Sequence, residues 1–226
     1  MSNRSIHTLL KNWDEECPLT REEAVEVLNL PEEEMDSLME CAYALRTKYK
    51  GKKVSVQLLT NVRSGNCTQN CAYCAQSKDS QAEIEKYKRV SDEKLYGDND
   101  LVDEKHLARH CIGLSGIGFS DEEIEDLADR IREMKKKDTQ ICCSIGFLTE
   151  KQARILKDAG LDRINHNLNS SRSFYPEICT THTYDQRVNN IKMLQSLGFE
   201  ICSGGIVGMG ESKEDIVDML MDLREI

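Results

Sequence analysis

Three cysteines lie close together in the run Cys67–Cys74, CTQNCAYC, with the spacing C-x3-C-x2-C. A structural zinc site usually takes four Cys or His ligands, and the next such residue along the chain is His106. Three thiolates suit a four-iron cluster, because they leave one iron open to a small molecule. By itself the motif leaves three interpretations open: an iron–sulfur cluster, a zinc ion or a chance grouping of thiols.

The overall composition favours metal or redox chemistry over structural disulfides. The chain has 226 residues and ten cysteines, and its N-terminus lacks the apolar segment of a secretory signal. No apolar run reaches the 18 residues of a membrane-spanning helix, so we expect a cytoplasmic protein without a membrane partner. The net charge of −10 argues against nucleic acid as a partner, because phosphate binding needs a basic face.

A glycine-rich run, GGIVGMGE at Gly204–Glu211, is the second candidate motif. A backbone without side chains lets a flat adenine ring or a phosphate group approach closely. The spacing is not the G-x-G-x-x-G of dinucleotide-binding proteins, so that function is poorly supported. A turn-rich loop without a ligand is the alternative for this run.

The elements that position these motifs alternate between strands and helices. We expect a helical N-terminal segment at residues 1–50 and an α/β domain at 51–226. Strands are predicted at 54–60, 108–115, 139–146, 161–169 and 199–207, and helices near 121–137, 149–159, 184–197 and 212–225. Within 95–111 we predict a loop, because Gly97–Asp100 interrupts the helical pattern. Five such units suit either part of a (β/α) barrel or a doubly wound sheet.

Cysteines recur on the predicted strands. Cys111 lies on the second, Cys142 and Cys143 on the third, and Cys202 on the fifth. Because alternate residues of a strand point to opposite faces, Cys142 and Cys143 face opposite ways. Only one of the two can therefore enter the interior of a barrel.

The fourth predicted strand ends in NHNLN, residues 165–169. The same alternation puts Asn165, Asn167 and Asn169 on one face and His166 on the other. Buried amides require hydrogen-bond partners, so we predict a polar ligand beside the three asparagines. His166 is predicted to be a core histidine.

Four runs together resemble a known family. CTQNCAYCAQS resembles the motif of the radical S-adenosylmethionine (SAM) superfamily. INHNLNSS, ICTTHTYDQRV and ICSGGIVGMGES are similar to the biotin synthase family within it, and the resemblance covers roughly residues 20–226. It implies a TIM-type (β/α) barrel that is truncated here after about five units.

The resemblance also implies a reaction and its cofactors. Cys67, Cys71 and Cys74 would hold a [4Fe–4S] cluster whose open iron chelates SAM. Reductive cleavage of SAM would give a 5′-deoxyadenosyl radical, which removes hydrogen from dethiobiotin. A second cluster, commonly [2Fe–2S], would then donate the sulfur that closes the ring of biotin. The implied partners are an electron donor such as flavodoxin or ferredoxin and, for the full-length protein, a second copy in a homodimer.

Individual residues carry over from the family by position. Cys111, Cys142 and Cys202 match the cysteines of the sulfur-donor cluster. The residues expected to bind SAM are Tyr73, Asn167, Asn169, Arg187, Gly204, Gly205, Gly208 and Glu211, and those expected to bind dethiobiotin are Asn165 and Asn167. Asn169 stands where many members have an Asp that contacts the ribose of SAM. Whether Asn169 makes the same contact is open from the sequence.

Further departures concern the second cluster. Cys143 and Cys179 are extra thiols. Because Cys143 should face away from Cys142, we predict that Cys143 is a core residue. The family's fourth ligand is commonly an Arg on a later strand, beyond Ile226, so the nuclearity of this cluster is open. The chain stops within a predicted helix, and we expect a fragment that is inactive alone unless another segment or a partner completes the barrel.

Two other functions remain open from the sequence. A related radical methylase or cofactor-maturation enzyme on the same barrel would leave Cys111, Cys142 and Cys202 without a role. A non-enzymatic metal-binding module is the alternative from another class.

Overall fold

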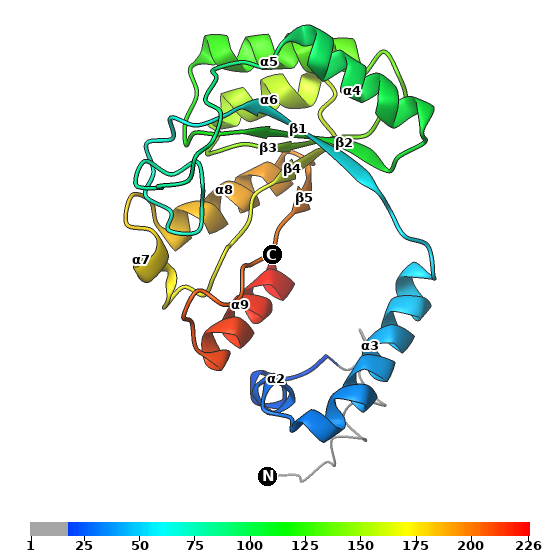
Figure 1. Ribbon diagram of the computed structural model, residues 1–226, viewed down its shortest axis with the longest axis vertical. Coiled ribbons are helices and arrows are strands. Elements are labelled where there is room, and N and C mark those ends of the chain that lie inside the picture. Colours follow the sequence, from blue (N-terminus) through cyan, green and yellow to red (C-terminus); the bar gives the residue numbers. More distant parts are fainter. Residues whose placement is uncertain (1–17) are drawn as a thin grey trace.

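The computed structural model describes residues 18–226, and its centre is one parallel five-stranded sheet. The strands are β1 (Gln57–Arg63), β2 (Arg109–Leu114), β3 (Ile141–Ser144), β4 (Arg163–Asn165) and β5 (Glu200–Cys202). They pair in the order β1-β2-β3-β4-β5 (Figure 1). A doubly wound sheet reverses its strand order at a switch point, whereas a (β/α) barrel adds strands in sequence. The order therefore confirms the TIM-type architecture, here as five consecutive strands.

The helices of the crossovers pack on one face of the sheet. They are α4 (Asp92–Glu104), α5 (Asp121–Met134), α6 (Glu150–Asp158) and α8 (Tyr184–Ser196); α7 (Tyr175–Ile178) and α9 (Lys213–Glu225) complete this part of the chain. Ile112, Cys143 and Ile164 are fully buried between the sheet and these helices. The predicted core position of Cys143 is thus confirmed.

The predicted helices and strands differ from the structure mainly at their ends. The four predicted helices correspond to α5, α6, α8 and α9, and each of these begins at a Ser or Thr that forms a capping box. Strands β2 to β5 are shorter than predicted, whereas β1 has the predicted length but begins three residues later than expected. The chain before it is exposed, with Val54 at 73% and Val56 at 56% of their full accessibility.

The prediction of a loop within 95–111 was wrong. Helix α4 runs through Gly97–Asp100, and its first turn is capped by the Ser91 side chain, which accepts from Lys94 N–H. Local sequence favours a turn here because Gly, Asp and Asn are poor helix formers. Tertiary contacts reverse that preference, since Asp98 and Asn99 are buried against the sheet.

A buried polar network joins α4 to β1 and β2. Thr60 Oγ1 donates to Asp98 Oδ2 at 2.6 Å and lies 2.8 Å from His110 Nε2. His110 Nδ1 lies 3.2 Å from Asn99 Oδ1, so both ring nitrogens are bonded. Burial opposes ionisation of Asp98, but hydrogen bonds from Lys94 and Thr60 outweigh it and lower its pKa.

We expect Asp98→Ala to destabilise the fold, because it removes the acceptor that Thr60 and the His110 network need in a buried place. The expected loss is about 2 kcal/mol in the free energy of unfolding, measured as a lower urea midpoint at unchanged slope. Asp100→Ala on the same helix is the matched control. Its carboxylate is exposed and pairs with Lys137 at 2.5 Å, so little change is expected. Equal midpoints for the two variants would contradict the role of the network.

The N-terminal helices stand apart from the sheet. They are α2 (Arg21–Leu28), the 3-10 turn η1 (Glu32–Glu34) and α3 (Met35–Lys50). Helix α2 packs on α9, where Arg21 pairs with Asp218 at 2.6 Å and Arg224 Nη1 donates to Leu19 O at 2.7 Å (Figure 1). The predicted helical character of residues 1–50 is observed from Arg21 on, and residues 1–17 lie outside the described part. Within residues 18–226, no helix is long and apolar enough to cross a membrane.

Candidate functional site

The sheet face away from the packed helices carries two rows of side chains set by the strand register. One row consists of Leu59, Cys111, Cys142, Arg163 and Glu200. The next row, nearer the carboxyl ends of the strands, consists of Asn61, Gly113, Ser144, Asn165 and Cys202. Parallel strands with this layering expose their functional groups at the carboxyl end. The three cysteines predicted to hold a second cluster thus lie on one face, in adjacent rows.

Two of these cysteines interact directly. A hydrogen bond from the Cys142 thiol, helped by the charges of Arg109 and Arg163, lowers the pKa of Cys111 to about 7. Cys111 Sγ also lies 3.0 Å from Gln57 Oε1. The same pairing with Cys111, together with burial, raises the pKa of Cys142. Near neutral pH the pair therefore shares one proton, held by Cys142, and the Cys111 thiolate is available to bind a metal.

Arg163 is a neighbour that sequence reasoning missed. It lies in the row of Cys142, and its Nε donates to Glu200 Oε2 at 2.9 Å. Its charge acts on both Cys142 and Cys202. Because alternate residues of a strand share a face, counting back two positions from Asn165 would have placed Arg163 on this face. The cysteines near Arg163 lie on three other strands, so their position beside it depends on the strand register.

A cavity of about 300 Å³ lies above the second row of side chains, toward the carboxyl ends of the strands. The predicted site residues in its wall are Cys67, Cys71, Tyr73, Cys74, Asn165, Asn167, Asn169 and Arg187. This is the size of a small-molecule pocket. The structure therefore brings the cysteine motif together with the asparagines of the fourth crossover.

The cysteine loop is fastened to the turn after α7. Ala72 N donates to Ile178 O at 2.9 Å, and Asn70 Nδ2 donates to Thr180 Oγ1 at 2.7 Å. Asn70 Oδ1 in turn accepts from the backbone N–H groups of Thr180 and Thr181. These bonds hold a loop that has no regular secondary structure of its own.

The predicted alternation of NHNLN was wrong at His166. Strand β4 ends at Asn165, and Asn169 has a φ of 71°, so the segment is not one extended strand. As a result His166 lines the same cavity as Asn165, Asn167 and Asn169. The ring is 3% exposed, as expected for a buried histidine, but Nε2 has no hydrogen-bond partner among the described residues. Burial, reinforced by the charge of Arg187, lowers the pKa of His166 to about 3.

Arg187 organises one side of the cavity. Its Nε donates to Tyr175 Oη at 2.5 Å, its Nη1 to Asn167 O at 3.0 Å and its Nη2 to His182 Nε2 at 3.1 Å. Across the cavity, Asn169 Nδ2 donates to Tyr73 Oη at 2.6 Å. Burial raises the pKa of Tyr73, so this phenol stays protonated.

The glycine-rich run lies beside the cavity rather than in its wall. Asn169 N donates to Gly204 O at 3.0 Å, and Ile206 N donates to Asn169 O at 2.9 Å. A Cβ at Gly205 would lie 1.8 Å from Met219 Sδ, so a larger residue there requires the Met219 side chain to move. The carboxylate of Glu211 accepts from its own loop, including Gly208 N–H, which lowers its pKa. Gly204, Gly205, Gly208 and Glu211 thus stay predictions as SAM-binding residues.

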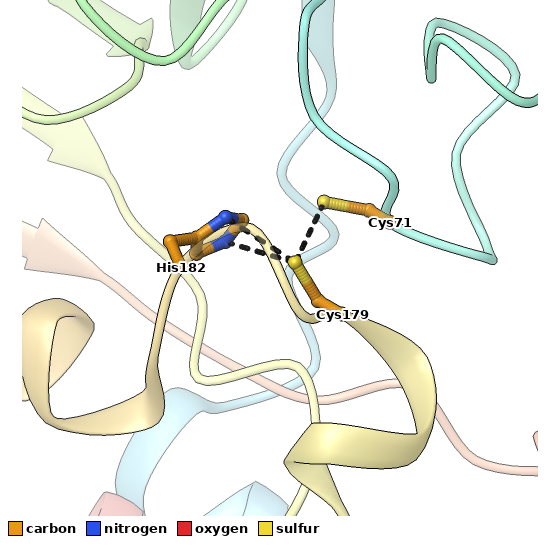
Figure 2. A group of neighbouring side chains, drawn as sticks. All are labelled: Cys71, Cys179 and His182. Carbon is orange, nitrogen blue, oxygen red and sulfur yellow. Dashed lines mark hydrogen bonds between the residues drawn. The ribbon is translucent and has the colours of Figure 1, made fainter.

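A group of metal-ligating side chains at the cavity was also missed. Cys71 Sγ lies 3.7 Å from Cys179 Sγ, and Cys179 Sγ lies 3.3 Å from His182 Nδ1 (Figure 2). All three residues are buried. Burial, followed by the neighbouring Cys179, raises the pKa of Cys71 to about 12. Cys71 and Cys179 are 108 positions apart, so only the fold could bring them together.

The donors of the cavity fit a thiolate-bound cluster with a polar ligand. Cys67, Cys71 and Cys74 share its wall with four asparagines, an arginine and the unpartnered Nε2 of His166. An orphaned buried nitrogen calls for a ligand that completes its hydrogen bond.

Comparisons with known proteins agree with this arrangement. A model of the radical SAM superfamily matches residues 61–223. The chain is 41% identical over 209 residues to biotin synthase of Geobacillus kaustophilus (strain HTA426), covering 92% of this chain and 63% of that protein. It is 40% identical over 210 residues to biotin synthase of Rhodopirellula baltica, covering 92% of this chain and 58% of that one. The chain therefore spans about three-fifths of the length of these curated relatives.

Solved structures share the fold at low sequence identity. Methylornithine synthase matches with a TM-score of 0.84 at 16% identity, over 96% of this chain and 63% of its own. A maturase of the [FeFe]-hydrogenase matches with a TM-score of 0.77 at 19% identity, over 92% of this chain and 47% of its own. At such identities the likeness concerns the fold alone.

Proposed function

The chain belongs to the radical SAM superfamily, and from that premise we propose that it belongs to an enzyme that inserts sulfur into dethiobiotin to form biotin. The family implies a [4Fe–4S] cluster and SAM. Cys67, Cys71 and Cys74 would hold the cluster, and Tyr73, Asn167, Asn169 and Arg187 would hold SAM in the same cavity.

When bound, the cluster and SAM supply one-electron cleavage of the sulfonium and a radical that removes hydrogen from carbon. The chain's own residues bind and orient the reactants. Arg187 fixes the Asn167 carbonyl, and Tyr73 fixes the Asn169 amide, so both asparagines are positioned before a ligand enters. Buried His166 is neutral and has a free Nε2 for a polar group of the ligand.

The observation that carries the sulfur chemistry is the row of cysteines below this cavity. Cys111 and Cys142 lie opposite each other on β2 and β3, and Cys202 follows in the next row. A methylase or maturation enzyme on the same barrel gives these thiols no role. We assign them to a second iron–sulfur cluster that donates sulfur, with Asn165 and Asn167 beside the bound dethiobiotin.

The remaining parts of the proposal concern the setting of the reaction. A one-electron donor of the flavodoxin or ferredoxin type would reduce the cluster. A cytoplasmic location suits the nine described cysteines, which are all free. The homodimer rests on the resemblance to the family alone.

The test is anaerobic turnover of the natural protein, expressed from its complete reading frame and reconstituted with iron and sulfide. With SAM, a reductant and dethiobiotin, we expect 5′-deoxyadenosine and biotin, both measured by mass spectrometry. Deoxyadenosine without biotin would reject dethiobiotin as the substrate and keep the superfamily. The absence of both products from protein with a full cluster would reject the proposed enzyme.

A further inference from the structure

The thiols and the imidazole beside the cysteine loop already have the spacing of a mononuclear metal site. In a tetrahedral site with Zn–S of about 2.3 Å and Zn–N of about 2.0 Å, two sulfurs lie about 3.8 Å apart and a sulfur and a nitrogen about 3.5 Å. Cys71 and Cys179 have their sulfurs 3.7 Å apart, and His182 has its ring nitrogens 3.3 and 3.8 Å from Cys179 Sγ. One ligand atom from each of the three residues lies within 4.8 Å of the other two.

We propose that Cys71, Cys179 and His182 bind a thiophilic divalent cation of the zinc class when no iron–sulfur cluster is present. Two thiolates and one imidazole are a donor set that zinc takes, with a fourth position left for water. Figure 2 shows the sulfur of Cys179 between the Cys71 thiol and the His182 ring. It is the only such group of three ligands found among residues 18–226.

The surroundings fix the tautomer of the imidazole. Arg187 Nη2 is a donor and lies 3.1 Å from His182 Nε2, so Nε2 carries the lone pair. The proton therefore sits on Nδ1, which donates to Gln69 Oε1 at 3.0 Å. A ligating histidine usually donates its second N–H to an oxygen in this way. Binding through Nε2 costs one Arg187 hydrogen bond, while the arginine keeps its bonds to Tyr175 and Asn167.

The scaffold under the two thiols is fixed as well. The loop of Cys71 and the turn of Cys179 are joined by the Ala72 N to Ile178 O bond and by the side chain of Asn70. Little ordering is therefore needed when a cation arrives, which favours binding.

The site and the proposed cluster exclude each other because both need Cys71. This exclusion rests on the proposed function, whereas binding of the cation does not. Cys67 and Cys74 belong only to the cluster, and Cys179 and His182 belong only to the cation site, so variants separate the two.

The experiment titrates the metal-free, reduced chain with Co²⁺, a spectroscopic probe for zinc, under anaerobic conditions. We expect one Co²⁺ per chain with thiolate charge-transfer absorption and tetrahedral d–d bands, displaced by Zn²⁺. Cys179→Ala, Cys179→Ser and His182→Ala should each weaken binding by at least about tenfold, with folding checked by circular dichroism. The double variant Cys67→Ala/Cys74→Ala, which cannot hold the cluster, should bind Co²⁺ within about threefold of the parent.

The opposite pattern would overturn the proposal. If the Cys67→Ala/Cys74→Ala variant loses Co²⁺ while Cys179→Ser keeps it, the loop thiols alone are the ligands. A second arm tests the exclusion: one equivalent of Zn²⁺ should reduce iron uptake during reconstitution of the parent but not of Cys179→Ala. Equal inhibition of both proteins would refute the exclusion. Failure of the zinc-free parent to form any cluster would count against the proposed function and leave the Co²⁺ titration intact.

Discussion

Replacing Cys67 and Cys74 together by Ala is expected to abolish reductive cleavage of SAM. The loop offers three thiolates to one cavity, and no other pair of thiols lines its wall among the described residues. The variant keeps Cys71 and its neighbour Cys179, so a four-iron cluster lacks the third thiolate that it needs. The loss in rate should be at least about 1,000-fold, which corresponds to about 4 kcal/mol of transition-state stabilisation.

The measurements are iron and sulfide content, the electron paramagnetic resonance signal of the reduced protein, and 5′-deoxyadenosine formed from SAM. Cys41→Ala is the matched control, because this thiol lies on α3, away from the cavity. It should keep the cluster and the rate. A double variant that still released deoxyadenosine at the parent rate would place the cluster elsewhere.

The architecture could be predicted from the sequence because its signals are local. The capping boxes at Thr149 and Thr183 and the apolar faces of the helices depend on residues a few positions apart. The opposite orientation of Cys142 and Cys143 follows from strand alternation alone. The order of the strands was left open by the residues and was correctly chosen through the family resemblance.

The errors arose where distant contacts decide the local structure. Asp98 and Asn99 indicate a turn by composition, but bonds to Thr60 and His110 hold them in helix α4. In NHNLN, strand β4 ends at Asn165, so the alternation that the pattern suggested does not extend to His166. Neither outcome can be deduced without the sheet register, which joins residues from several crossovers.

The candidate site also combines features that depend on local sequence with features that depend on distant contacts. Cys67, Cys71 and Cys74 could be proposed together as ligands because one loop carries all three, and the structure places them in the wall of one cavity. The contact of Cys71 with Cys179 could not be foreseen, since it depends on how the loop after β1 meets the turn after α7. Chemistry that is assembled from separate elements becomes visible only in the folded chain.

Cys142→Ala should separate the two halves of the proposed reaction. The side chain lies beside Cys111 on the sheet face away from the packed helices, below the cavity wall that holds Cys67, Cys71 and Cys74. Removing it leaves those three proposed ligands intact but takes one cysteine from the proposed sulfur-donor site. Deoxyadenosine formation should stay within about threefold of the parent, whereas biotin formation should fall at least about 100-fold, or about 2.7 kcal/mol.

The same variant should change the reactivity of Cys111. Loss of the Cys142 hydrogen bond should raise the pKa of Cys111 above about 7, and slow its alkylation at neutral pH in the metal-free protein.

Cys143→Ala is the matched control from the next position of the same strand. Its side chain is fully buried on the opposite face, packed under the helices. This variant should keep the iron and sulfide of both clusters and lose about 1–2 kcal/mol of stability through the small cavity it leaves. The pair of neighbours therefore tests orientation directly: activity should depend on Cys142 and stability on Cys143. If Cys143→Ala lost the second cluster and Cys142→Ala kept it, the assignment of sulfur donation to the sheet face that carries Cys111 and Cys142 would be wrong.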